Sequence, residues 1–363
     1  MQIGIDIKTL RNKRAGIQNY VIELLDKLQS IDTQNNYILY EPSKTDYTIK
    51  NRKWKRVLIR SRLPGTLWMQ FRLPRRVKKD NVDVLWCPEG ISPLRKIKGC
   101  KIITSIHDFT FIHYPHTMRK WSFLMLKLFS RRTFSISDMI TTNSNFTKRE
   151  LFSLYNQVIL PPVRTVPCGS PYWSKPGDYR PEKRSNHLLF VGSIEPRKNI
   201  VKLIEAMENL KSRGLIVPLH IIGLRGWKNS SVKEKIMHSS CRDTLILKGY
   251  LTESQLKAEY LNCKAFIFPS IYEGFGLPVL EAISLDCLVL TSKDTVMQEV
   301  AKEHALYFDP KDPLDIANAI WKIYEDRFDR TKYLKRSNKL LKEYSWDNSA
   351  EKLLLLFKSC LSR

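Results

Sequence analysis

The sequence has 363 residues, 43% of them hydrophobic and 10% aromatic, which predicts a folded protein too long for a single core. This composition excludes a disordered chain, and no apolar run approaches the length of a membrane-spanning helix. Lys and Arg number 61 against 36 Asp and Glu, for a net charge of +25. Residues 1–172 hold 30 basic and 12 acidic side chains, so most of the excess lies there. The charge indicates an acidic partner, such as an anionic membrane surface, phosphorylated substrates or nucleic acid.

The seven cysteines are scattered and form no CxxC pair. Residues 1–7 are typical of a first strand and not of a signal peptide, because no basic region precedes an apolar one. We therefore expect reduced, mostly buried thiols in a cytosolic protein.

The chain begins with a predicted strand, a basic loop and a helix. Residues 2–7 form the strand, and the helix opens at Gly16 with an apolar stripe from Ile17 to Leu28 at helical spacing. A strand, a glycine loop and a helix N-terminus together can offer backbone N–H groups to an anion. One glycine alone is a weak signal, since most such glycines only permit a turn.

Residues 44–79 combine thirteen Lys and Arg with a single acidic side chain, Asp46. Trp54, Trp68, Phe71 and several leucines are interleaved with them. This mixture favours a membrane surface, where aromatic rings lie at the headgroup level and cations face anionic lipid. The alternatives are a solvated basic face over ordinary core residues, and a nucleic-acid surface.

Three short β-like runs follow, at residues 83–87, 101–106 and 139–142. His107 comes directly after the second run, at the carboxyl end of a strand, where ligands bind in open parallel sheets. We therefore assign His107 to a functional site. His113 and His116 lack a fixed ligand spacing, so no metal site is predicted.

A turn-rich stretch near residues 167–181 predicts a domain boundary. Strands are then expected at residues 187–191, 219–222, 245–247, 265–270 and 289–290, in alternation with helices. This pattern predicts a second doubly wound parallel sheet.

The segment from Glu273 to Glu281 follows the apolar run 265–268 and contains two glycines and a proline. Gly274 and Gly276 allow a tight turn and close backbone approach, and Pro278 suits the first helical position. A helix N-terminus at this turn would favour a phosphate. On the residues alone, the segment is either a phosphate site or an ordinary strand–turn–helix with solvated glutamates.

These stretches together resemble the glycosyltransferases of family 4, over nearly the whole chain. The most specific match is the E-x7-E segment from Glu273 to Glu281, and further matches lie at residues 191–199, 105–108, 143–145 and 308–310. The resemblance implies an α/β GT-B fold with two Rossmann-like doubly wound domains that face an interdomain cleft. The implied domains are 1–172 for the acceptor and 173–345 for the nucleotide-sugar, with a helix at 346–363 that returns to the first domain.

The resemblance also implies roles for individual residues. Glu281 would bind the ribose hydroxyls of the nucleotide and Glu273 the hydroxyls of the donor sugar, while Lys198 would bind the distal phosphate. The remaining assignments complete the site: the N–H groups of Phe275, Gly276 and Leu277 at the sugar and diphosphate, Gly16 at phosphate, and His107 beside the anomeric carbon.

Two departures from the family pattern stand out. Ser193 occupies a position where the family often has an arginine, and Arg197 is a candidate replacement. Asp286 replaces a glycine and must then tolerate a left-handed backbone conformation.

The resulting prediction is a retaining hexosyltransferase that needs no metal or other cofactor, with GDP-mannose as the first candidate donor and a UDP-hexose as the alternative. Its expected partners are a lipid-linked or oligosaccharide acceptor and the anionic inner face of the membrane, with no nucleic acid. The alternatives are a nucleic-acid-binding protein that uses the basic surface, a GT-B nucleotide-sugar epimerase, and a glycosidase with Glu273 and Glu281 as its carboxylate pair.

Overall fold

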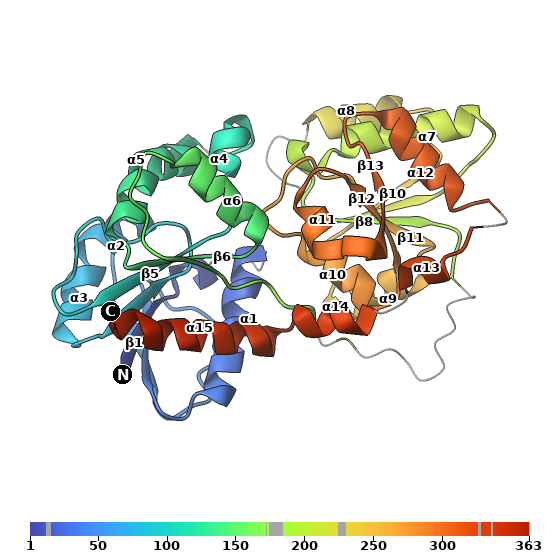
Figure 1. Ribbon diagram of the computed structural model, residues 1–363. Coiled ribbons are helices and arrows are strands. Elements are labelled where there is room, and N and C mark those ends of the chain that lie inside the picture. Colours follow the sequence, from blue (N-terminus) through green and yellow to red (C-terminus); the bar gives the residue numbers. More distant parts are fainter. Residues whose placement is uncertain are drawn as a thin grey trace. The chain divides into compact units, whose positions relative to one another are not determined.

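The computed structural model describes residues 1–11, 16–118, 120–171, 173, 184–223, 230–325, 328–334 and 337–362. The chain divides into two compact units, each built on its own parallel sheet (Figure 1). Unit 1 comprises Met1–His113, Lys120–Gly169 and Tyr344–Arg363, and unit 2 comprises Tyr114–Arg119 and Ser170–Glu343.

The sheet of unit 1 has the strand order β3-β2-β1-β4-β5-β6-β7, and every neighbouring pair is parallel. Its central strands are almost entirely buried, as expected for a parallel sheet covered on both faces. The strands are β1 (Gln2–Asp6), β2 (Asn36–Glu41), β3 (Trp54–Leu58), β4 (Val84–Cys87), β5 (Lys101–Ile106), β6 (Met139–Thr142) and β7 (Val163–Thr165).

Helices of unit 1 connect these strands, and the last helix of the chain joins them. The helices are α1 (Gly16–Ile31), α2 (Gly65–Phe71), α3 (Leu73–Lys79), α4 (Thr110–His113), α5 (Lys120–Ile136), α6 (Asn145–Leu154) and α15 (Trp346–Leu361). Helix α15 packs on α1, β4 and β5, and the ring centroids of Phe357 and Trp86 are 6.2 Å apart. Its first residue meets the chain at Gly169, where a Cβ would lie 2.3 Å from the Trp346 nitrogen.

The sheet of unit 2 is also parallel throughout, in the order β10-β9-β8-β11-β12-β13. Its strands are β8 (Leu188–Val191), β9 (Leu219–Ile222), β10 (Leu245–Gly249), β11 (Ala265–Phe268), β12 (Leu288–Ser292) and β13 (Ala305–Phe308). The helices are α7 (Ile200–Ser212), α8 (Ser230–His238), α9 (Glu253–Asn262), α10 (Leu277–Ser284), α11 (Val296–Ala301), α12 (Pro313–Lys322), α13 (Thr331–Leu334) and α14 (Ser337–Glu343).

The basic segment 44–79 was predicted to present aromatic side chains at a surface, but several of them are buried in the core. Trp54 begins the edge strand β3 and is 5% exposed, and Trp68 on α2 is fully buried with its ring N–H on the Ile59 carbonyl. Both rings are therefore core residues. Phe71 remains 55% exposed and Leu63 39%, so only part of the predicted apolar surface faces solvent.

Three local features expected from the sequence can be compared with the structure. Asp286 has a φ of 51°, which confirms the left-handed conformation expected where it replaces glycine. All seven cysteines are buried and none forms a disulfide. Most of the turn-rich stretch expected near residue 181 lies outside the described residues.

Candidate active site

In unit 2 the strand order reverses direction between β8 and β11, which is where ligands bind in open α/β sheets. The loops that leave the carboxyl ends of these two strands contact each other. The Ile271 N–H donates to the Arg197 carbonyl at 3.0 Å, and the Ser270 hydroxyl oxygen lies 3.1 Å from the same carbonyl. The two sequence motifs at residues 191–199 and 269–281 therefore meet at one point.

The Glu273 carboxylate lies between two cations at this point. Lys198 Nζ is 2.6 Å from one oxygen, and the Arg197 guanidinium is 2.7 Å from the other. The Ser270 hydroxyl donates to the same carboxylate at 2.6 Å. Three residues named from the sequence, namely Arg197, Lys198 and Glu273, thus form one charged group.

Burial and charge act in opposite directions on this group. Burial alone would raise the pKa of Glu273, but the neighbouring Arg197 and Lys198 charges lower it to about 2. Burial lowers the pKa of Lys198, and the Glu273 charge opposes that shift. Glu273 is therefore a fixed anion at neutral pH.

Arg197 points toward the same carboxylate as Lys198. Its other nitrogen lies 2.8 Å from Glu195, and the Ser193 hydroxyl also donates to Glu195, at 3.0 Å. Ser193 therefore supports Arg197 through Glu195.

Helix α10 begins at this turn, with Gly276 as its N-cap at a φ of 102°. Pro278 is the second helical residue and not the first, because the helix starts at Leu277. A Cβ at Gly276 would lie 2.7 Å from the Met297 side chain, so both the backbone and the space require glycine. Phe275 is buried beside it. The first N–H groups of a helix have no partner within it, so this end has a partial positive charge.

Glu281 lies on α10, away from these cations. It accepts a hydrogen bond from the Tyr260 hydroxyl at 2.9 Å. Burial raises the pKa of Glu281 to about 7, although the Tyr260 hydrogen bond opposes the shift. The two glutamates of the E-x7-E segment therefore have opposite electrostatic surroundings.

Unit 1 has its own reversal of strand order, between β1 and β4, and charged residues gather there too. Lys8 Nζ lies 2.6 Å from Asp6 and 2.5 Å from Glu89. Burial and the Glu89 charge raise the pKa of Asp6, while Lys8 opposes them. Sequence reasoning missed this group, although Asp6 is the last residue but one of a predicted strand and Glu89 closely follows another. The same signal had selected His107.

His107 lies beside this group. Its Nε2 donates to the Pro88 carbonyl at 2.6 Å, and its ring meets the Tyr20 ring edge-on, with centroids 4.9 Å apart. Burial lowers the pKa of His107. The ring is thus held neutral, with Nε2 protonated, at the carboxyl edge of the sheet.

Gly16 is the first residue of α1 and is exposed. A Cβ built there would meet nothing within 4 Å, and its φ is not in the left-handed range. The described part of the protein therefore does not itself require glycine at this position.

His113 ends α4, and His116 lies in the short helical turn that follows. The His113 ring lies 2.7 Å from Glu150 of α6, as an ion pair or hydrogen bond. Among the described residues one group has the composition of a metal site, namely His187 with His220 and Glu259.

Comparison with known families accounts for both units. Residues 14–170 match the model described as "Glycosyltransferase Family 4", and residues 173–344 match "Glycosyl transferases group 1". O-antigen chain mannosyltransferase B of Escherichia coli is 28% identical over 71% of this chain and 70% of its own length. O-antigen chain mannosyltransferase RfbU of Salmonella typhimurium is 25% identical over 67% of this chain and 65% of its own.

Another relative matches more closely over a shorter region. The serotype-specific mannosyltransferase WbdA of Escherichia coli is 33% identical, over 46% of this chain and 20% of its own length.

Solved structures show the same fold at low sequence identity. Sucrose-phosphate synthase from Thermosynechococcus elongatus has a TM-score of 0.77 at 15% identity, with 99% of both chains covered. HepE of Anabaena, crystallised with UDP and glucose, has a TM-score of 0.74 at 14% identity, over 99% of this chain and 100% of its own. The protein is therefore a glycosyltransferase of family 4, an enzyme with two Rossmann-like domains of the GT-B fold.

Proposed function

We propose that the enzyme transfers a hexose, with mannose as the first candidate, from a nucleotide-sugar to a glycan acceptor, with retention of anomeric configuration. The acceptor would be lipid-linked and the product a cell-envelope polysaccharide. The observation that carries the proposal is the Arg197–Lys198–Glu273 group at the strand reversal of unit 2. The names of the O-antigen mannosyltransferase relatives support the sugar and the pathway class.

Breaking the sugar–phosphate bond develops negative charge on the leaving diphosphate. Lys198, Arg197 and the N-terminus of α10 would supply positive potential there, without a metal. A carboxylate has about four acceptor positions, and Glu273 has three partners here. It can therefore keep its cations and still accept a hydrogen bond from a sugar hydroxyl. Glu281 would accept from the ribose.

In unit 1 we propose that the acceptor lies near Lys8, Glu89 and His107. A lysine between two carboxylates suits neutral hydroxyl groups better than phosphates, because the group has one positive and up to two negative charges. The proposed mechanism gives the proton of the acceptor hydroxyl to the departing phosphate. His107 would then contribute hydrogen bonding beside the transferred sugar and not a positive charge.

The decisive experiment offers the purified enzyme GDP-mannose and UDP-hexoses with a lipid-linked acceptor, and identifies the product by NMR. A product with the donor's anomeric configuration, formed equally well in EDTA, is the expected result. An inverted product would overturn the retaining mechanism. A free epimeric nucleotide-sugar formed without acceptor would show an epimerase instead.

We also propose that unit 1 binds an anionic membrane surface, with α5 as the main contact. Trp121, Leu124 and Leu128 recur at helical spacing on α5 and are 50%, 43% and 58% exposed. The exposed cations of the same helix are Lys120, Lys127, Arg131 and Arg132. An exposed apolar stripe bordered by cations suits the lipid interface. In the part of the chain that the structure describes, no helix combines the length and hydropathy of a membrane span.

Sedimentation with vesicles tests this surface. Binding to anionic vesicles should exceed binding to neutral ones and weaken with salt. Trp121→Ser should weaken it several-fold, whereas Ile159→Ser, which removes an apolar side chain outside α5 that is 93% exposed, should not. Equal binding of Trp121→Ser and the unmodified enzyme would contradict the assignment of α5.

A further inference from the structure

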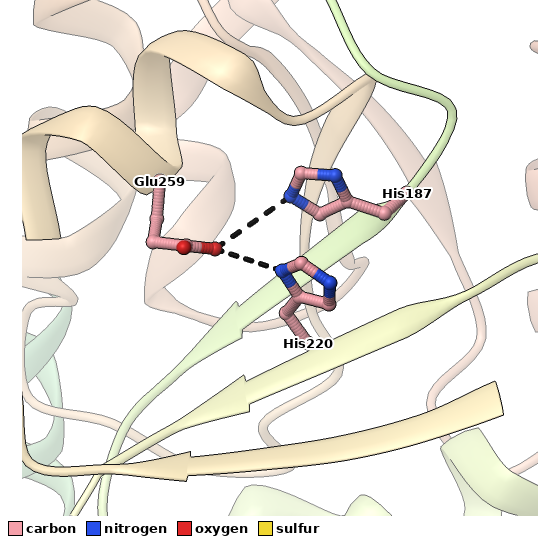
Figure 2. A group of neighbouring side chains, drawn as sticks. All are labelled: His187, His220 and Glu259. Atoms are coloured by element: carbon pink, nitrogen blue, oxygen red, sulfur yellow. Dashed lines mark hydrogen bonds and ion pairs between the residues drawn. The ribbon is translucent and has the colours of Figure 1, made fainter. Parts of the chain in front are cut away.

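His187, His220 and Glu259 form a compact cluster at the amino edge of the unit 2 sheet (Figure 2). His187 directly precedes β8, His220 is the second residue of β9, and Glu259 projects from α9. One ring nitrogen from each histidine and one carboxylate oxygen lie within 4.8 Å of one another. The two rings stack, with centroids 3.8 Å apart and an interplanar angle of 22°.

One ring nitrogen of each histidine lies close to the same oxygen of Glu259, Oε2. His220 Nδ1 lies 2.8 Å from that oxygen, within hydrogen-bond distance, whereas His187 Nε2 lies 3.7 Å from it. Figure 2 shows the two ring nitrogens directed at the carboxylate from two neighbouring strands. The pair thus converges on one point from a rigid part of the fold.

One ring nitrogen of His187 has no hydrogen-bond partner among the described residues. The residue is 7% exposed, and its Nε2 is buried without a hydrogen-bond partner. Leaving a buried polar nitrogen unpaired typically costs about 1–3 kcal/mol. Native structures rarely contain such a group unless a bound species completes it.

We propose that this cluster binds a divalent transition metal, with Zn²⁺ as the favoured ion, through His187 Nε2, His220 Nδ1 and Glu259 Oε2. Two imidazoles and a carboxylate are a recognised ligand set for zinc, and water would complete a tetrahedron. Bonds of about 2.0–2.2 Å place tetrahedral ligands about 3.3 Å apart. The present spacing therefore needs adjustments of an ångström or so.

The Lys248 ammonium group, which contacts Glu259, affects metal binding at this site in two ways. Its Nζ lies 2.6 Å from Glu259 Oε1, the oxygen that the histidines do not address. The contact orients the carboxylate, as outer partners of metal ligands commonly do. Its positive charge also opposes a cation nearby. The site should therefore bind more tightly when this charge is removed, an effect opposite in sign to loss of a ligand.

The location separates this site from the proposed chemistry. His187 precedes β8, whereas Lys198 follows the carboxyl end of the same strand. A metal here would join β8, β9 and α9 and would take no part in sugar transfer. Activity in EDTA and metal binding at this cluster are thus independent questions.

The test uses the full-length protein, stripped of metal and titrated with Co²⁺, whose visible absorption reports ligand number. One equivalent should bind, and Zn²⁺ should displace it and raise the midpoint of thermal unfolding. His187→Gln and His220→Gln should each weaken binding at least tenfold. His238→Gln, which removes an exposed histidine of α8, should have no effect, and Lys248→Met should tighten binding.

The outcomes divide cleanly. Failure to bind one equivalent, or binding unchanged in both His187→Gln and His220→Gln, would overturn the proposal. If those variants do not fold, Lys248→Met decides, because weaker or unchanged Co²⁺ binding in that variant contradicts a site on Glu259.

Discussion

The two units present charged groups at the same topological position but with opposite balance. At the reversal point of unit 2, one carboxylate, Glu273, has two cations on it. At the reversal point of unit 1, one cation, Lys8, has two carboxylates on it. The sheet topology thus determines where a polar group gathers, and the residues determine which ligand it suits. Our proposal places the diphosphate near the first group and the sugar hydroxyls of the acceptor near the second.

The largest effect is expected from Lys198→Ala. Removing one positive group that faces the leaving diphosphate should lower kcat about 10²–10³-fold. The matched control is Lys202→Ala on α7, since Lys202 is 42% exposed and pairs only with its helix neighbour Glu205 among the contacts described. Initial rates of both variants check the prediction. Normal turnover by Lys198→Ala would remove unit 2 from the proposed donor chemistry.

The two charged groups should also differ in stability. Glu273→Gln leaves the buried Lys198 without its anion and Arg197 with the Glu195 carboxylate, and it should lower the free energy of unfolding by roughly 3 kcal/mol. Glu89→Gln leaves Lys8 with Asp6 and should cost about 1 kcal/mol. Urea denaturation measures both changes, and hydrogen exchange in β8 and β4 locates them. Equal losses would contradict the difference drawn between the two groups.

The contribution of Glu273 should also depend on pH in a defined direction. Its pKa in the folded protein is lowered to about 2, from an ordinary value of 4.5. The stabilisation is therefore complete above pH 4.5 and is lost as the pH falls toward 2. Glu273→Gln should remove that part of the acid sensitivity.

Two glycines allow a comparison of fold with function. Gly276→Ala should lower stability by about 2 kcal/mol, because φ is 102° and Met297 occupies the space. Gly16→Ala should change stability by no more than about 0.5 kcal/mol, since nothing lies near its Cβ position. It should nevertheless lower activity about tenfold or more if a ligand approaches that backbone. Unfolding curves and initial rates separate the two, and full activity of Gly16→Ala would contradict its proposed role.

The smallest effect concerns Glu281. With its pKa raised to about 7, the carboxyl gains a proton as the pH falls below 7 and then accepts ribose hydroxyls less well. The KM for the donor should therefore rise with acidity, by up to about tenfold per pH unit. Tyr260→Phe removes the hydrogen bond that opposes the shift, so it should move the profile to higher pH. A KM that is flat between pH 6 and 8 would contradict this assignment.

The buried strands and the strand–turn–helix at residues 265–284 could be predicted from sequence, because both depend on local patterns. Strands 101–106, 139–142 and 219–222 have the predicted bounds, and Asp286 adopts the predicted conformation. The roles of Lys198, Glu273 and Glu281 were assigned through the resemblance to family 4 and stay predictions. Local patterns do not show that Arg197 shares the Glu273 carboxylate, since that contact spans 76 positions and depends on the pairing of β8 with β11.

The exposure of aromatic residues was beyond local reasoning. Trp54 and Trp68 lie in a strongly basic segment and are buried, whereas Trp121 has the helical spacing of a core stripe and is exposed. Periodicity identifies a face of a helix but not what covers it. The group at Lys8 and Glu89 was missed for a related reason, because it forms only when β1 and β4 are neighbours.

The return of α15 to unit 1 has a consequence for the order in which the protein matures. Most residues of unit 1 are translated before unit 2, whereas the helix that packs on β4 and β5 is translated after it. Unit 2 can therefore complete its fold before unit 1 does. Until then, the Trp86 side chain on β4 lacks its contact with Phe357 of α15. Unit 1 should therefore expose this apolar surface to chaperones until translation has passed residue 361.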